Sequence, residues 1–224
     1  MIEWSPIILS LKLAGITTFL LLVLAIPLSY WLSYTKSFIK PVIETLVSMP
    51  LVLPPTVIGF YLLIAFSPAN AFGEFLDETL NLRLVFSFEG LIIASLIYSL
   101  PFMVHPIQSG LNSLPESYSE ASFVMGKSRT ITLFRVLIPN IRSSILTGIV
   151  LTFAHTIGEF GVVLMIGGNI PDKTRVASIA IYDEVESLNY STANIYSIIL
   201  FSITFIILLT VYVTNGRYMK RIWK

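Results

Sequence analysis

Long apolar runs alternate with short polar segments along this chain. A helix needs about 20 residues to cross a hydrocarbon layer of about 30 Å, and runs of that length recur through the sequence. They cover residues 7–34, 42–66, 89–111, 140–166 and 193–214. Because the runs are continuous and do not alternate, they predict helices and not the strands of a membrane barrel. We therefore expect an all-α membrane protein in which residues 1–224 form a single domain with five transmembrane helices.

Composition supports a membrane location and removes several other classes of protein. Hydrophobic residues make up 55% of the chain and charged residues only 12%, which is more apolar than a soluble domain requires. The net charge of +1 is not gathered into a basic patch, so nothing indicates nucleic-acid binding. Cysteine is absent, which excludes disulfides, thiolate metal sites and cysteine nucleophiles. No positive charge precedes the first apolar run, so we expect no cleaved signal peptide.

Lysine and arginine are distributed unequally between the two sides of the expected helix bundle. With the N-terminus outside, ten of these cations lie in cytoplasmic loops and the tail, and four lie on or near the outer side. The ten are Lys36, Lys40, Lys127, Arg129, Arg135, Arg142, Arg217, Lys220, Arg221 and Lys224, and the four are Lys12, Arg83, Lys173 and Arg175. This positive-inside bias predicts an outer N-terminus and a cytoplasmic C-terminus in a multi-pass protein of the cytoplasmic (inner) membrane.

The second span contains more prolines than a plain membrane anchor would. Pro50, Pro54 and Pro55 fall within one crossing, followed by Gly59. Each interior proline removes a backbone donor and clashes with the preceding turn, so we expect this helix to be kinked or broken near mid-membrane. Two interpretations stay open: a helix that lines a translocation path with its freed carbonyls, or a structural kink packed against its neighbours.

The fourth span carries His155 and Glu159, which lie four residues apart and therefore share one helix face. Ionisable groups in a membrane usually face the bundle interior or a wet cavity. A zinc site would need a third ligand, and the other histidine, His105, lies in a different span. The remaining interpretations are a hydrogen-bonded helix contact lined by Gly158 and Gly161, or a role in gating.

Two outer segments are too polar to cross the membrane. After the fourth span, Thr174 is expected to cap a short amphipathic helix. This helix carries Val176, Ile179 and Val185 toward the membrane or the bundle. Acidic residues near its end oppose the helix dipole, so tertiary contacts must hold it. Residues 67–90 are expected to form a loop with at most one short surface helix.

Residues 113–139 form the main cytoplasmic stretch and contain specific signals for helix ends. Ser113 and Glu116 have capping-box spacing, which predicts a helix from Leu114 to Met125. Gly126 can adopt the left-handed conformation that ends such a helix.

A second short helix is expected after this turn, with Ser128 as its cap and its end before Pro139 at the membrane. The two helices would form a compact hairpin on the inner membrane surface. Its apolar face would carry Leu114, Tyr118, Ala121 and Met125. The alternative is an amphipathic loop that rests on lipid headgroups through its basic residues.

A family signature falls within this hairpin. The series Glu120-Ala121-Ser122, three residues, Gly126, nine residues and then Val136–Pro139 resembles the Glu-Ala-Ala signature of the membrane subunits of bacterial ATP-binding-cassette (ABC) importers. The chain departs from that signature at Ser122, which replaces a second alanine, and at two aliphatic positions within Val136–Pro139. All of these changes conserve size approximately.

The resemblance extends over nearly the whole chain. LVLPPTVIGFYLL in the second span and GEFGVVLMIGGNIPDKTRVASIAIYDEV after the fourth are similar to molybdate permeases. Permeases for sulfate and tungstate share much of this pattern. The resemblance therefore implies a type I (MetI-like) ABC importer fold and the import of molybdate, with tungstate or sulfate as alternatives.

The resemblance also implies partners. An extracytoplasmic binding protein would deliver the oxyanion, two copies of this chain would form the path as a homodimer, and two cytoplasmic ATPase subunits would each receive one hairpin. The sequence has no Gly-x-x-x-x-Gly-Lys-Ser/Thr phosphate loop, so the chain would be a transport subunit without cofactor or enzymatic activity of its own. The implied ATPase interface consists of Tyr118, Glu120, Ala121, Ser122, Met125 and Gly126.

A divalent oxyanion needs a polar lane through the lipid, although tight binding inside the lane would slow its release. Spans two to five carry no Lys or Arg in their cores, so we expect weak contacts only. The candidates for the path or its gate are Pro54, Pro55, Thr56, Thr152, Thr156, Glu159 and Asn169. An ionised Glu159 would repel an anion, so we expect it to be hydrogen-bonded at a gate or packing contact and not to bind substrate.

Three functions of other classes compete with this interpretation. An intramembrane enzyme could use His155 and Glu159, and chelator-sensitive turnover would distinguish it. A channel or secondary transporter would move anions without an ATPase. A membrane scaffold would only hold partners together.

Overall fold

The computed structural model describes residues 3–214, and every regular element within this range is a helix. Three helices are long and apolar enough to cross a membrane alone: α1 (Ser5–Tyr34), α5 (Phe88–Asn112) and α12 (Tyr190–Thr214). Two bent helix pairs bring the number of spans to as many as five. The sequence-based expectation of an all-α membrane protein is confirmed, and the five expected spans are present when each bent pair counts as one span. The C-terminal cations Arg217, Lys220, Arg221 and Lys224 lie outside the described residues.

The second span is broken, as its prolines predict. The helices α2 (Lys40–Val52) and α3 (Pro55–Phe66) meet at an angle of 115°. Leu53, between them, is extended, because a residue that precedes proline is pushed out of the helical region. Pro54 lacks the amide proton that would continue α2, and Pro55 fits the first turn of α3. Two helices therefore replace the single kinked crossing.

The fourth span differs from its expected range of 140–166. The helix α9 (Arg142–Ile157) ends at Gly158, and a separate short helix, α10 (Gly161–Gly167), follows. Tertiary bonds replace the helical ones at this break, because Ser178 donates to the carbonyl of Glu159. At its inner end α9 meets the helical segment Arg129–Asn140 at 78°.

The cytoplasmic stretch is a hairpin, but its helix ends differ from the predicted ones. Ser113 Oγ donates to the Gly110 carbonyl instead of capping a new helix, so α6 (Ser117–Val124) begins later than expected. The second arm runs through α7 (Arg129–Thr132), a π-helical turn (Leu133–Leu137) and α8 (Ile138–Asn140).

This second arm also passes through Pro139, before which it was expected to end. The π-helical turn explains why. Ile138 N–H bonds back to the Leu133 carbonyl, five residues earlier, so the ladder is already widened where Pro139 offers no donor. The side-chain amide of Asn140 donates to the Val136 carbonyl at 2.7 Å and satisfies another acceptor in this turn.

On the outer side, one short helix, α4 (Ala71–Leu80), occupies the segment 67–90 as expected. The amphipathic helix α11 (Ala177–Glu186) is also present, but Thr174 does not cap it. Thr174 instead accepts from Ile170 N–H and donates to the Gly167 carbonyl, which closes the preceding turn. The first amide of α11, that of Ala177, donates to Ser10 Oγ of α1 at 2.8 Å. A side chain from a distant helix therefore takes the capping role.

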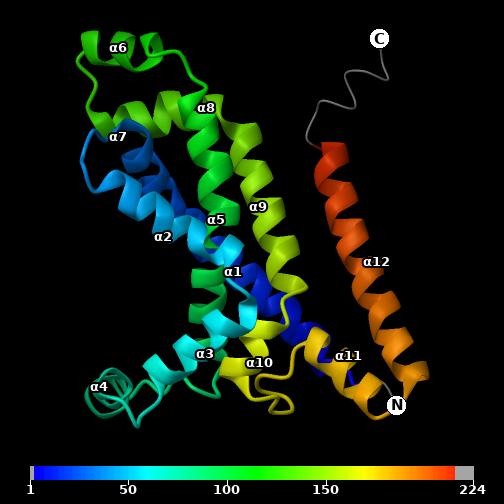
Figure 1. The fold of residues 1–224 in the computed structure, drawn as a ribbon. Coiled ribbons are helices and arrows are strands. Elements are labelled where there is room, and N and C mark those ends of the chain that lie inside the picture. The colour runs from blue at the N-terminus through cyan, green and yellow to red at the C-terminus, as the bar shows by residue number, and fades with distance from the viewer. Residues whose placement is uncertain (1–2, 215–224) are drawn as a thin grey trace.

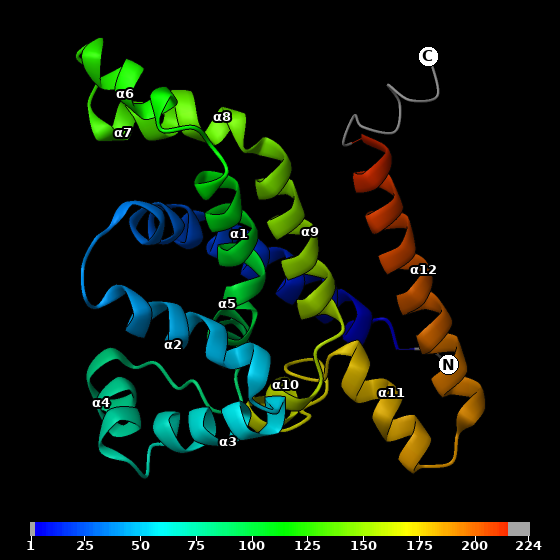
Figure 2. The same ribbon diagram turned by 45° about the horizontal axis from the view of Figure 1, so that its top comes forward.

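The helix α5 runs through the centre of the molecule and packs against both α1 and α9 (Figures 1 and 2). The hairpin and the last turn of α12 lie at one end. The first turn of α1, with α4, α10 and α11, lies at the other (Figure 1). This arrangement agrees with an outer N-terminus. The cations Lys36, Lys127 and Arg135 belong to the link between α1 and α2 and to the hairpin.

Candidate coupling hairpin and translocation path

The hairpin is held in shape by bonds inside each turn and between its two arms. Gly126, at φ +73°, ends α6 with a Schellman motif, in which Lys127 N–H bonds to the Ser122 carbonyl and Gly126 N–H to the Phe123 carbonyl. Ser128 Oγ accepts from Ile131 N–H and caps α7, as predicted. These bonds fix the orientation of α6 relative to α7.

Ser122 links the two arms. Its hydroxyl lies 2.8 Å from that of Thr132, and both side chains are buried. Ser122 was expected at the ATPase interface, but it faces the second arm and not the surface. Any contribution of Ser122 to an interface would therefore act through the position of α6. The sequence could not reveal this, because the same small residue suits a partner contact and an internal one.

The other expected interface residues are on the surface. Tyr118, Glu120, Ala121, Met125 and Gly126 are all exposed. Within residues 3–214 Glu120 makes no ion pair, so its charge is available to a partner. Two further apolar side chains, at positions 123 and 124, are exposed beside them and were not singled out from the sequence. No element within residues 3–214 covers this exposed face of α6.

Thr152, Thr156 and Glu159, which were expected in the path or at its gate, are buried between α9 and its neighbours. Ser95 of α5 donates to Glu159 Oε2 at 3.1 Å, and Ser99 of α5 lies 3.0 Å from Thr156 Oγ1. Glu159 is thus a hydrogen-bonded helix contact, which was one of the two interpretations left open. The three residues are buried in this conformation, so a role in the path would require α5 and α9 to separate.

His155 does not join Glu159 in a catalytic arrangement. Its ring stacks on Phe102 with centroids 4.0 Å apart and lies near Tyr98, at 4.9 Å. Within residues 3–214, no group of three or more His, Cys, Asp or Glu side chains is placed to hold a metal ion.

The residues at the bend of the second span serve as a packing surface. Pro55 faces Gly161 of α10, where the absence of a side chain allows close approach, and α3 and α10 lie in contact. Pro54 and Thr56 are exposed at the same bend. Of the expected path or gate residues, these two are therefore exposed at the bend between α2 and α3.

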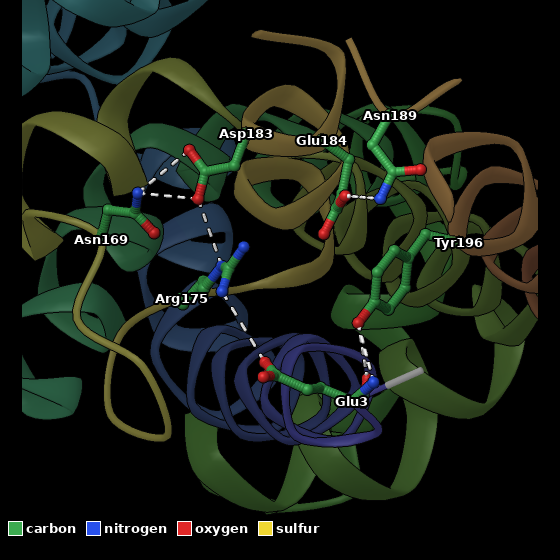
Figure 3. A network of polar contacts seen from close by, with 7 residues as sticks. All are labelled: Glu3, Asn169, Arg175, Asp183, Glu184, Asn189 and Tyr196. Atoms are coloured by element: carbon green, nitrogen blue, oxygen red, sulfur yellow. Dashed lines mark hydrogen bonds and ion pairs between the residues drawn. The ribbon is translucent and has the colours of Figure 1, made fainter. Parts of the chain in front are cut away.

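Asn169 belongs to a polar network on the outer side (Figure 3). Its amide donates to both carboxylate oxygens of Asp183, at 2.8 and 3.0 Å. Arg175 pairs with Asp183 at 3.2 Å and with Glu3 at 3.7 Å, and Tyr196 of α12 bonds to the backbone of Glu3. These tertiary contacts hold α11 in place although the acidic residues near its end oppose the helix dipole, as the sequence predicted.

A polar seam between α2 and α5 was missed in the sequence. Ser48 Oγ lies 3.2 Å from His105 Nε2, and Gln108 Nε2 donates to Glu44 Oε1 at 2.7 Å. The signal was present, because polar residues recur on α5 at positions 105, 108, 109 and 112 and on α2 at 40, 44, 45 and 48. Each set follows the helical repeat and therefore marks one face.

Residues 22–221 match a protein family described as the binding-protein-dependent transport system inner membrane component. The chain belongs to this family. It is 45% identical to the molybdenum transport system permease protein ModB of Azotobacter vinelandii over 86% of the chain and 85% of that protein. It is 30% identical to a putative molybdenum permease, YvgM, of Bacillus subtilis over 92% and 90%, respectively. A sulfate permease, CysT, of Synechocystis is 33% identical over 77% of the chain and 60% of its own length.

Solved structures support the fold. A bacterial ABC transporter that imports the acidic polysaccharide alginate has a TM-score of 0.80 at 17% identity, and covers 95% of this chain and 78% of its own. The fold is therefore that of a type I, MetI-like importer permease, and family membership makes the chain an inner-membrane transport component and not an enzyme.

Proposed function

We propose that this chain is the membrane-spanning permease of an ATP-driven importer that carries molybdate across the cytoplasmic membrane. The hairpin carries this proposal, because it presents the importer signature, with Glu120 exposed, at the cytoplasmic end of a molybdenum-permease-like chain. Tungstate and sulfate are the alternative substrates, since sulfate permeases match the same chain at lower identity or over less of their length.

A permease of this family works with a binding protein and with ATPase subunits. We infer that two copies of this chain assemble around a two-fold axis, the commonest symmetry of homo-oligomers. Each hairpin would fit a groove in one ATPase subunit. The apolar side chains of Tyr118 and Met125 would fill the groove, and Glu120 would find a cationic or hydrogen-bonding partner there.

The hairpin is connected so that a movement of α6 reaches the bundle. Its first arm follows α5 after a short link, and its second arm leads through α8 into α9. The Ser122–Thr132 contact makes the two arms move together. Closure of the ATPase dimer would therefore shift α5 and α9 relative to α2 and α3, which is the rocking that alternating access needs.

Charge reversal at Glu120 tests this coupling. In a reconstituted complex with the binding protein, we expect molybdate uptake to require ATP. Glu120→Lys should abolish that uptake, because it either uncouples ATP hydrolysis from transport or releases the ATPase. The matched control is Glu78→Lys on α4, an exposed charge reversal at the opposite end, which should leave the ATPase bound.

Two results would contradict the proposal. Normal transport by a Glu120→Lys complex that co-purifies with its ATPase would show that the hairpin is not the lever. Anion uptake by the chain alone in vesicles would indicate a channel or secondary transporter instead. Competition by unlabelled tungstate and sulfate in the same assay ranks the three anions.

A further inference from the structure

The α2–α5 seam borders two hollows in the inner half of the molecule. One, of about 620 Å³, lies along α2 beside Glu44, Thr45 and Ser48. The other, of about 520 Å³, lies along α5 and is lined by His105, Gln108, Ser109, Asn112 and Ser113. The contacts Ser48–His105 and Glu44–Gln108 join the two linings into one surface. Each hollow exceeds many times the roughly 30 Å³ that a water molecule occupies in the liquid, so a partly hydrated ion fits.

The lining of the second hollow is rich in uncharged donors. Ser109 and Asn112 are exposed and have no hydrogen-bond partner for their side chains among residues 3–214. Gln108 has a second amide proton beyond the one that it gives to Glu44. From His105 to Asn112 these groups extend for about 10 Å along α5, at about 1.5 Å per residue. Such a row can replace an anion's hydration shell without holding the ion tightly.

The acidic group on the seam does not oppose an anion strongly. Glu44 accepts from Gln108 at 2.7 Å and lies 3.9 Å from Lys40 Nζ. Its charge is thus partly compensated from both sides. No other Asp or Glu lines either hollow within residues 3–214.

We propose that the α2–α5 seam is the inner half of the oxyanion lane, where His105, Gln108, Ser109 and Asn112 bind a tetrahedral divalent oxyanion weakly as it leaves for the cytoplasm. This inference rests on the proposed function, because a second copy of the chain must cover the seam to close the lane. The proposal places the inner contacts on the side of α5 that faces α2, and not on the buried threonines of α9.

The absence of cysteine allows a direct test. The test variant is Ser109→Cys, and its matched control is Ser202→Cys on the exposed face of α12. Each variant is assembled into the full complex in nanodiscs. Each complex is treated with the anionic thiol reagent sulfonatoethyl methanethiosulfonate during ATP turnover, and modification is read from the mass of this chain. We expect Ser109→Cys to be modified and, in vesicles, to take up molybdate about tenfold more slowly or worse, with ATP hydrolysis retained.

A second pair of variants separates charge from size. Asn112→Asp puts a carboxylate in the lane and should slow uptake by about tenfold, whereas Asn194→Asp, at an exposed position of α12, should not. The lane is elsewhere if Ser109→Cys stays unmodified, if its modification leaves uptake unchanged, or if ATP hydrolysis falls in parallel with uptake. Failure of the unmodified wild-type complex to take up molybdate would instead overturn the proposed function.

Discussion

Glu159 is buried at the break between α9 and α10, where it contacts two other helices. Its side chain accepts from Ser95 of α5, and its backbone carbonyl accepts from Ser178 of α11. The second carboxylate oxygen has no partner among residues 3–214. A residue that bonds to both α5 and α11 at a helix break is well placed to sense their relative movement.

The substitution Glu159→Gln tests this position. Glutamine keeps an acceptor for Ser95 but carries no charge, so we expect the complex to assemble and its basal ATP hydrolysis or coupling ratio to change. The order in which molybdate, tungstate and sulfate compete should stay the same, because the side chain is buried between helices. Uptake assays with competing anions measure both effects. A changed order with normal coupling would mean that Glu159 contacts the substrate.

The sequence allowed the chemistry of these residues to be predicted better than their partners. That Glu159 would need hydrogen bonds follows from placing a carboxylate in lipid. That Ser95 is the partner of Glu159, and Ser99 that of Thr156, depends on how α5 and α9 rotate against each other, which no local pattern encodes. Thr156 was expected in the path for its hydroxyl, but Ser99 already uses that hydroxyl.

At the scale of elements, the contact of α3 with α10 depends on two glycines. A Cβ atom on Gly161 would lie 2.9 Å from Pro55 Cβ, and one on Gly59 would lie 2.7 Å from Met165 Cβ. The proline ring cannot move away as a flexible side chain could. The close approach of these short helices therefore requires the absence of a side chain at position 161.

We expect Gly161→Ala to destabilise the protein by about 1 to 3 kcal/mol, as overpacking of a tight contact does. The thermal unfolding midpoint of the detergent-solubilised chain measures this. Gly15→Ala is the matched control, because a Cβ there meets nothing within 4 Å and α1 is a regular helix. Equal midpoints for the two variants would show that α3 and α10 do not pack as described.

Element breaks were predictable where proline causes them. The bend between α2 and α3 follows from Pro54 and Pro55. The break after α9 is held by the tertiary bond to Glu159, and in the sequence only the nearby glycines indicate it. The late start of α6 has a similar cause, because Ser113 bonds backward to α5 although its spacing to Glu116 fits a cap. Local capping rules fail where a neighbouring carbonyl competes for the same hydroxyl.

At the scale of the whole molecule, α12 stands apart from the other long helices (Figure 2). Only 6% of its most apolar stretch is buried inside the chain. Its main attachment is to α11 and to the N-terminal segment at the outer end. The sequence predicted that α12 spans the membrane, but not that it would stand apart, because an apolar run of this length reads the same whether or not other helices of the chain pack against it.

The outer network in Figure 3 therefore anchors α12. Tyr196 is buried, and its hydroxyl accepts from Glu3 N–H and donates to the Glu3 carbonyl, each at 3.0 Å. Through the Glu3 carboxylate the network continues to Arg175 and Asp183. Loss of the hydroxyl removes both backbone bonds and leaves the other contacts in place.

We expect Tyr196→Phe to lower the free energy of unfolding by about 1 to 2 kcal/mol, since each hydrogen bond contributes about 0.5 to 1.5 kcal/mol. Tyr190→Phe, at an exposed position in the first turn of α12, should have no effect on the thermal midpoint. Asp183→Asn weakens the same network at its far side. Because Glu3 connects the two ends, Tyr196→Phe and Asp183→Asn should combine to less than the sum of their separate effects. Strict additivity would mean that the N-terminal segment and α11 hold α12 independently.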